Sequence, residues 1–266
     1  MQIGVGNQHT CVLHNTDEVL CFGKGLDGQI GNNSYEAATT PTQPQELGAV
    51  NQLWVGQNLS CARRMAGQVL CWGKDFYGAS CASNGGFVHL CTHRTPRLAP
   101  QLTHLESQHL VFGRSRRSQD DAFSRLGLAL LPNGQVAGFG VQEENFSYNM
   151  GGVQRYQAIP GLAGGVAGAT GRQHSCVRLD SGQVRCWGHG ELGQTGSGRS
   201  WSAQESLHLN FIPMLVAEID NATDLDASDD STCAVQANGS LWCWGKLNHP
   251  RPEGWVAPTY VQGLDE

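Results

Sequence analysis

The 266 residues are enough to bury a substantial core, and 39% of them are hydrophobic. The 35 glycines and a charged content of only 15% are typical of an all-β protein with many turns and few surface helices. A formal net charge of −6 argues against a nucleic-acid-binding protein, because phosphate-binding surfaces concentrate lysine and arginine.

The chain contains no apolar run of about 18 residues, so we expect no membrane insertion. The most apolar stretch begins at Leu126 and ends where Pro132 interrupts it. Met1 and Gln2 lead directly into a predicted strand at Ile3, so we expect no secretory signal in this chain. The two alternatives are a leader that was removed from this chain and a leader that never existed.

Five segments share one pattern, in which two strand-like runs are joined by a tight turn and closed by an aromatic residue followed by glycine. The closing pairs are Phe22-Gly23, Trp72-Gly73, Phe139-Gly140, Trp187-Gly188 and Trp244-Gly245. We predict hairpins over residues 9–23, 59–73, 126–140, 174–188 and 231–245, all within a single domain spanning 1–266.

The turn of each predicted hairpin is a three-residue loop. If Cys176 and Cys186 face each other across the fourth hairpin, residues 180–182 form that loop. Loops of this length place their third residue in the left-handed region, where glycine has no steric penalty. The third position holds Asp17 in the first hairpin and glycine in the other four, at Gly67, Gly134, Gly182 and Gly239.

Cysteines recur in pairs that are ten positions apart. The pairs are Cys11/Cys21, Cys61/Cys71, Cys81/Cys91, Cys176/Cys186 and Cys233/Cys243. The Cα atoms of opposed residues in an antiparallel ladder lie about 4.5 to 5.5 Å apart, which is within the Cα–Cα range of a disulfide. We therefore predict five disulfides. Metal binding and free core thiols are the alternatives, although zinc sites usually use shorter spacings. Disulfides would place the protein in an extracellular, periplasmic or cell-surface environment.

Each repeat is predicted to begin with a short apolar strand before its hairpin. A glycine-rich bend follows the hairpin, and a strand led by proline ends the unit. The prolines are Pro41, Pro96, Pro213 and Pro258. The third repeat departs from the pattern, because Leu128 and Gly138 stand where both cysteines are expected.

The motifs G-x-x-H-[ST]-C, G-Q-V-x-C-W-G and G-x-x-G-Q resemble the regulator of chromosome condensation family, most clearly over residues 173–196 and 8–31. The resemblance implies a β-propeller of four-stranded antiparallel blades. The cysteine-paired hairpins are similar to those of secreted bacterial members. Five repeats favour a closed five-bladed ring in which the two termini complete one blade. A fragment of a seven-bladed ring and an open arc are the alternatives.

Departures from the repeat are the predicted partner-binding elements, because long loops on a rigid scaffold often bind partners. Candidate contacts lie in three departures, at 74–99, 114–121 and 197–211, and at two tryptophans in Gly/Pro/Ser-rich surroundings. They are His89, His93, Arg94, Arg114, Arg116, Arg117, Trp201 and Trp255. Tolerated surface insertions are the alternative interpretation.

Other conspicuous side chains are interpreted as structural. His9 and His174 occupy the same position in their repeats, so we expect them to bond a neighbouring blade. The repeat tryptophans are expected to pack between blades. An acidic group at residues 226–230 lacks the ligand spacing of a calcium loop, so we expect no metal and no cofactor.

The sequence contains no G-x-S-x-G elbow, H-E-x-x-H helix or phosphate-binding loop with lysine, so we expect no enzymatic activity. It therefore predicts a monomeric binding module that presents loops to a protein or glycan partner. The resemblance implies two alternatives. One is an exchange factor for a small GTPase, and the other is an inhibitor of the secreted β-lactamase-inhibitor type.

Overall fold

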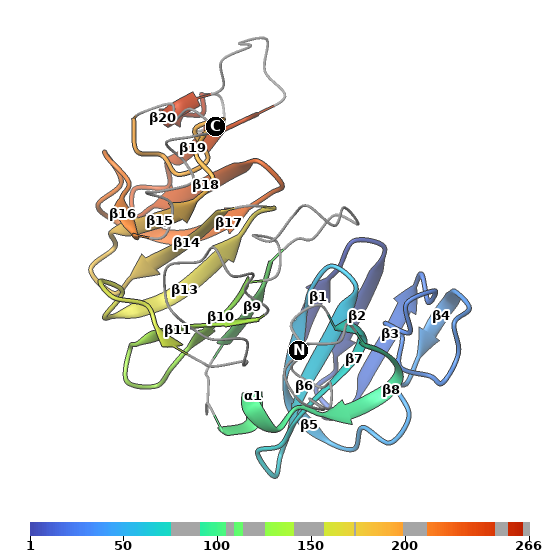
Figure 1. The fold of residues 1–266 in the computed structure, drawn as a ribbon. Helices are drawn as coiled ribbons and strands as arrows, with labels where there is room; N and C mark the ends of the chain where they lie inside the picture. Colours follow the sequence, from blue (N-terminus) through green and yellow to red (C-terminus); the bar gives the residue numbers. More distant parts are fainter. Residues whose placement is uncertain are drawn as a thin grey trace. The chain divides into compact units, whose positions relative to one another are not determined.

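The computed structural model describes residues 1–75, 91–104, 109–113, 126–140, 157–172, 174–198, 212–247 and 255–262. These residues form five four-stranded antiparallel sheets and one short helix, α1 (Pro100–His104) (Figure 1). The predicted all-β fold is confirmed. Within this described part of the chain, no helix is long and apolar enough to cross a bilayer.

Each sheet is formed by four strands that are consecutive in the chain. Sheet 1 contains β1 (Gln2–Val5), β2 (His9–Leu13), β3 (Val19–Gly23) and β4 (Ala38–Thr42). Sheet 2 contains β5 (Val50–Val55), β6 (Leu59–Arg64), β7 (Val69–Asp75) and β8 (Cys91–Leu98). Sheet 3 contains β9 (His109–Phe112), β10 (Leu126–Leu130), β11 (Val136–Gly140) and β12 (Gln157–Ala158).

The last two sheets repeat the same order. Sheet 4 contains β13 (Gly165–Thr170), β14 (His174–Leu179), β15 (Val184–Gly188) and β16 (Met214–Leu215). Sheet 5 contains β17 (Ala222–Ala227), β18 (Ser231–Gln236), β19 (Leu241–Gly245) and β20 (Trp255–Tyr260). The chain divides into two compact units, one with sheets 1 and 2 and one with sheets 4 and 5, while the strands of sheet 3 are divided between them.

The two termini lie in different sheets, which differs from the prediction that they complete one blade. Strand β1 pairs with β2, and β20 pairs with β19. Residues near Pro258 do form an outer strand, but it is the outer strand of the fifth repeat and not of the first. Closure of the five sheets into one ring stays a prediction.

The hairpin turns have the predicted backbone geometry. The third loop residue is left-handed in all five, with φ of 63° at Asp17 and 76° to 87° at the four glycines. In the fourth hairpin the Gly182 N–H donates to the Leu179 carbonyl at 2.9 Å, which closes the loop. These turns fix the register that places paired cysteines opposite each other.

Four of the predicted disulfides are present, with Cα–Cα distances of 4.1 Å. They are Cys11–Cys21, Cys61–Cys71, Cys176–Cys186 and Cys233–Cys243. Cys91 is disulfide-bonded as well, and its predicted partner Cys81 lies outside the described residues. These four pairs therefore hold neither a metal nor free thiols, and they indicate an oxidising compartment.

Three of the four prolines lie inside their outer strands instead of leading them. Pro41, Pro96 and Pro258 are internal to β4, β8 and β20, and only Pro213 precedes its strand. An outer strand has one unpaired edge, where the missing proline N–H costs no ladder hydrogen bond. The prolines therefore mark strand edges.

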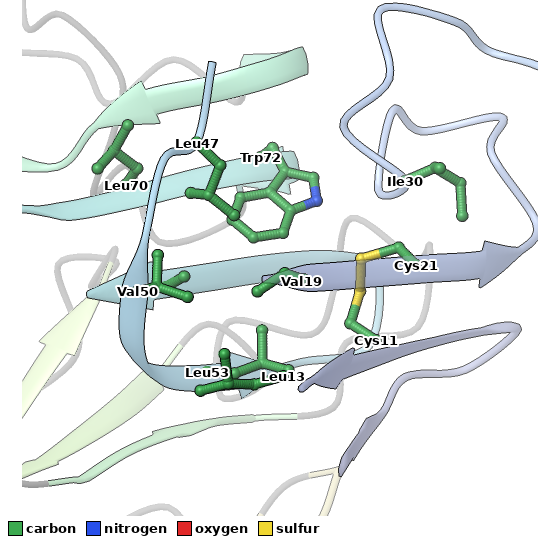
Figure 2. Close-up of a cluster of buried hydrophobic side chains, with 11 residues drawn as sticks. Cys11, Leu13, Val19, Cys21, Ile30, Leu47, Val50, Leu53, Leu70 and Trp72 are labelled. Carbon is green, nitrogen blue, oxygen red and sulfur yellow. A yellow bond between two sulfur atoms is a disulfide. The ribbon is translucent and has the colours of Figure 1, made fainter. Parts of the chain in front are cut away.

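Alternate residues of each hairpin point to opposite faces of its sheet. We call the face that carries the disulfide the C-side face, because it packs on the following sheet, and the opposite face the N-side face. Figure 2 shows Leu13 and Val19 on the C-side face of sheet 1 in one buried cluster with Leu53 and Leu70 of sheet 2. Sheets 4 and 5 pack in the same way, with Val184 and Leu225 in one cluster.

Candidate functional site

The two repeat histidines hold adjacent sheets together. His9 Nε2 lies 2.9 Å from Ser60 Oγ in sheet 2, and His174 Nε2 lies 2.7 Å from Thr232 Oγ1 in sheet 5. Both imidazoles are only 3% exposed. The structural interpretation is confirmed, and a free partner has no access to these rings.

Burial keeps both imidazoles neutral. It lowers the pKa of His9 from 6.5 to about 4. Burial, with a smaller contribution from His189, lowers the pKa of His174 to about 3. Because the charged form is disfavoured in a buried environment, these rings act as neutral hydrogen-bonding groups at ordinary pH.

Two of the three repeat tryptophans connect their sheet to the glycine-rich bend of the preceding repeat. The Trp72 indole N–H donates to the Gln29 carbonyl at 2.9 Å, and the Trp244 indole makes the same bond to Gln194. Both indoles are completely buried. The predicted role between blades is confirmed for these two tryptophans, which leaves the departures from the repeat as candidates for function.

The insertion of the second repeat lengthens the antiparallel pair of strands β7 and β8. Strand β7 has seven residues where β3 and β15 have five, and β8 has eight where β4 has five. Beyond the pair of Gly73 and His93, which has a counterpart in sheet 1, the added pairs join Lys74 to Thr92 and Asp75 to Cys91. The described part of the insertion is thus a longer two-stranded ladder, with a disulfide-bonded Cys91 at its edge.

Arg94 forms an exposed surface together with Tyr35, a residue of the first repeat. The Arg94 guanidinium carbon lies 5.1 Å from the centroid of the Tyr35 ring, which is 44% exposed. The Asn33 N–H donates to the Arg94 carbonyl at 2.9 Å. We call residues Asn33, Tyr35 and Arg94 the Tyr35–Arg94 surface.

Local hydrogen bonds fix the backbone under Tyr35. The Ser34 N–H donates to the Asn32 side-chain oxygen at 3.2 Å, and the Glu36 N–H donates to Ser34 Oγ at 3.0 Å. The glycine-rich bend also approaches β8 closely, because a Cβ on Gly28 would lie 2.6 Å from the His93 carbonyl oxygen. The Tyr35–Arg94 surface is therefore held by two repeats.

The chemistry of this surface suits an anionic ligand group. A guanidinium offers paired donors that match a carboxylate or a phosphate, and its stacking on an aromatic ring orients those donors. His93 Nε2 lies 3.1 Å from the sulfur of Cys91, so the imidazole is positioned by the disulfide-bonded edge. The tyrosine ring adds an apolar contact area beside the charge.

Most of the other predicted contact residues cannot be placed. His89, Arg114, Arg116, Arg117 and Trp201 lie outside the described residues, and the side chain of Trp255 does too. Of the predicted contact residues, only His93 and Arg94 have described side chains, at adjacent positions of β8. Tyr35 was missed because it belongs to a bend far from β8 in sequence, and no local motif signals that contact.

An open groove of about 370 Å³ lies beside the first hairpin turn, lined by residues 16–19, 43, 44 and 47–49. Its titratable lining consists of Asp17 and Glu18, without a histidine, cysteine or lysine. Among the described residues, no cluster of three or more His, Cys, Asp or Glu side chains could hold a metal ion. The Tyr35–Arg94 surface is thus the better candidate site.

Comparison with known proteins identifies the repeats. Residues 2–29 and 166–194 match the regulator of chromosome condensation (RCC1) repeat. The mitochondrial RCC1 domain-containing protein RUG3 of Arabidopsis thaliana is 25% identical over 99% of this chain and 59% of its own length. The mouse E3 ubiquitin-protein ligase HERC2 is 28% identical over 75% of this chain, which spans only 4% of that protein.

Solved structures show the same fold. The crystal structure of Prp20p from Saccharomyces cerevisiae, described with its binding to Gsp1p and histones, matches 99% of this chain and 65% of its own with a TM-score of 0.74. Human WBSCR16 matches 99% of this chain and 67% of its own with a TM-score of 0.70. At 20% and 21% identity these likenesses establish the RCC1-type propeller fold alone. The eukaryotic relatives give no support to the predicted likeness to secreted bacterial members.

Proposed function

We propose that this chain of RCC1-type repeats is a non-catalytic binding module, extracellular, periplasmic or on the cell surface, that binds a protein or glycan partner. The observation that carries the proposal is the Tyr35–Arg94 surface, an exposed pair that joins Tyr35 of the first repeat to Arg94 of β8, a strand with a disulfide-bonded Cys91. The scaffold supports it, because four disulfides and buried bonds between sheets leave little conformational entropy to lose on binding.

An exposed carboxylate on the partner is the group that fits Arg94. Acidic side chains of a protein and acidic sugars of a glycan both provide it. Arg94 carries the positive charge of this surface on a chain whose formal net charge is −6, so attraction depends on the placement of Arg94 and not on the overall charge.

The experiment compares partner capture by the intact protein and by Arg94→Ala and Tyr35→Ala variants, with material from the envelope fraction of the source organism. Truncating one central contact residue of an interface typically reduces affinity about tenfold or more. Lys246→Ala is the matched control, because Lys246 is an exposed cation in the other unit. Unchanged partner sets and affinities for both surface variants would refute the proposal.

The exchange-factor reading remains as the second candidate, because the Prp20p structure is described with its binding to Gsp1p. It requires an intracellular chain with reduced cysteines. Stimulated nucleotide release from a small GTPase, combined with reactive thiols in the native protein, would favour it over an extracellular binding module. The inhibitor reading has its own test, which is loss of β-lactamase activity on adding the protein.

A further inference from the structure

Five segments of the chain have the form Asn-x-Ser or Asn-x-Thr, which is the acceptor sequence for N-linked glycans. The segment that begins at Asn145 lies outside the described residues. The other four begin at Asn32, Asn58, Asn221 and Asn238. Because so short a pattern often arises by chance, the surroundings of each asparagine and each hydroxyl decide which segment suits a glycan.

One of these four described segments exposes both its asparagine and its hydroxyl residue. Asn221 and Thr223 are both exposed. In the segments that begin at Asn32 and Asn238 the hydroxyl residue is half-buried. A glycan is bulky and hydrated, so the asparagine that carries it needs a side chain in contact with solvent. Asn221 meets this requirement most fully.

The segment that begins at Asn58 has the opposite arrangement. Its hydroxyl residue Ser60 is 0% exposed, and Ser60 Oγ lies 2.9 Å from His9 Nε2. The Asn58 carbonyl accepts the Lys74 N–H at 2.8 Å, which fixes the backbone of this segment against β7. An enzyme cannot reach the Ser60 hydroxyl once the chain has folded. Asn58 is therefore an internal comparison for Asn221.

The backbone at Asn221 lies at the junction of two hairpin turns. The Asn221 carbonyl accepts the Ala237 N–H of sheet 5 at 2.9 Å, and the Ala222 N–H donates to the Gly182 carbonyl of sheet 4 at 2.9 Å. A Cβ on Gly182 would lie 2.9 Å from the Asn221 Cα, so the turn of sheet 4 packs on the main chain. Sheets 4 and 5 belong to one compact unit, so this junction is complete within that unit.

The Asn221 amide keeps one hydrogen available for substitution. Its Nδ2 donates to Asp220 Oδ1 at 3.2 Å, and a primary amide has two N–H donors. Thr223 Oγ1 donates to the Val235 carbonyl at 3.2 Å, so this hydroxyl bonds locally at the surface of sheet 5. A glycan on Nδ2 therefore leaves the bond to Asp220 and the packing of the main chain unchanged.

We propose that Asn221 is an N-glycosylation site of this protein. The reaction joins Asn221 Nδ2 to the anomeric carbon of an oligosaccharide that is carried on a lipid pyrophosphate. The bond between this carbon and the pyrophosphate oxygen breaks, and Nδ2 releases one proton. Glycosylation of Asn221 rests on the extracellular or cell-surface part of the proposed function and on a eukaryotic secretory route that supplies the lipid-linked donor. It adds a hydrated cover over the junction of sheets 4 and 5.

Peptide mass spectrometry of the protein from its native source tests the proposal. Peptide-N-glycosidase in heavy-oxygen water converts each glycosylated asparagine into a labelled aspartate, and a parallel digest without the enzyme corrects for spontaneous deamidation. We expect the label at Asn221 in most molecules and little or none at Asn58. An unlabelled Asn221, or equal labelling at Asn221 and Asn58, would overturn the proposal.

Variants produced in the same cells separate loss of the glycan from a folding defect. Thr223→Ala destroys the acceptor segment and should abolish the label at Asn221, whereas Thr223→Ser preserves the segment and should retain the label. Asn221→Gln should lower the intact mass by one glycan, and Asn58→Gln is the matched control that should not. Circular dichroism checks that each variant is folded. Undiminished labelling of Thr223→Ala would overturn the proposal.

Partner capture distinguishes this glycan from the proposed binding function. An unlabelled Asn221 in a disulfide-bonded protein whose partner capture depends on Arg94 would overturn the glycosylation alone. A labelled Asn221 in a protein whose partner capture ignores both Arg94→Ala and Tyr35→Ala would support the glycosylation and refute the binding surface.

Discussion

The imidazole of His9 and the hydroxyl of Ser60 are hydrogen-bonded across two sheets, with Nε2 and Oγ 2.9 Å apart. The Ser60 hydroxyl itself donates to the Gln29 carbonyl at 3.2 Å, so the shared hydrogen comes from His9 Nε2. His174 and Thr232 repeat this arrangement between sheets 4 and 5. A buried histidine–hydroxyl bond therefore accompanies the apolar packing in both of these sheet pairs.

Removing the hydroxyl of Ser60 should destabilise the protein. In Ser60→Ala the buried His9 Nε2–H loses its acceptor, which costs about 1 to 3 kcal/mol of the free energy of unfolding. Urea unfolding monitored by tryptophan fluorescence measures the change. Thr39→Ala, at an exposed position of β4, is the control and should change stability by less than about 0.5 kcal/mol. Equal midpoints for the two variants would contradict the buried bond.

The free energy of unfolding should fall as the pH is lowered from 6.5 toward 4. The unfolded chain binds a proton at each histidine near pH 6.5, whereas burial holds the pKa of His9 near 4 and that of His174 near 3. The unfolded state therefore binds more protons in this window, and each histidine contributes about 1.4 kcal/mol of lost stability per pH unit. Below about pH 4 the His9 contribution is constant.

A variant with His9→Leu and His174→Leu isolates this effect. The second repeat has a leucine at this position, Leu59, which is only 1% exposed. A leucine side chain therefore fits the site. The double variant should show a flatter dependence of unfolding free energy on pH between 4 and 6.5. A slope as steep as that of the wild type would rule out the two histidines as its source.

The glycine three residues before each repeat histidine should not tolerate a larger side chain without loss of stability. A Cβ on Gly6 would meet the His9 ring and lie 2.6 Å from the Gly56 carbonyl oxygen. Gly6→Ala should therefore cost about 1 to 3 kcal/mol through overpacking. Gly67→Ala is the comparison, because nothing lies within 4 Å of its Cβ and only its φ of 87° opposes the change. A larger loss for Gly67→Ala, measured by urea unfolding, would contradict the packing explanation.

Much of the fold was predictable because one pattern recurs. The ten-residue cysteine spacing and Gly182 fix a three-residue turn, and that turn alone determines the register of the fourth hairpin. The prediction that a proline leads each outer strand was wrong for Pro41, Pro96 and Pro258. The sequence does not reveal where the paired edge of an outer strand ends. Tyr35 could not be predicted beside Arg94, since their contact depends on how the bend of one repeat packs on the outer strand of the next.

Removing one disulfide should weaken the protein without unfolding it. The pair Cys176→Ala and Cys186→Ala releases a loop of about ten residues, for which chain entropy predicts a loss of about 3 kcal/mol. The third repeat supports folding without the bond, because Leu128 at the first cysteine position is completely buried in β10. Thermal unfolding measures the difference. A variant as stable as the wild type would contradict the predicted contribution of this disulfide to stability.

The central claim is that disulfides close the repeat hairpins of a rigid binding scaffold in an oxidising compartment. Mass spectrometry of alkylated, unreduced protein from its native source tests this most directly. We expect no alkylated cysteine, and peptides linked as Cys11–Cys21, Cys61–Cys71, Cys176–Cys186 and Cys233–Cys243. Alkylation at these eight cysteines would contradict the account.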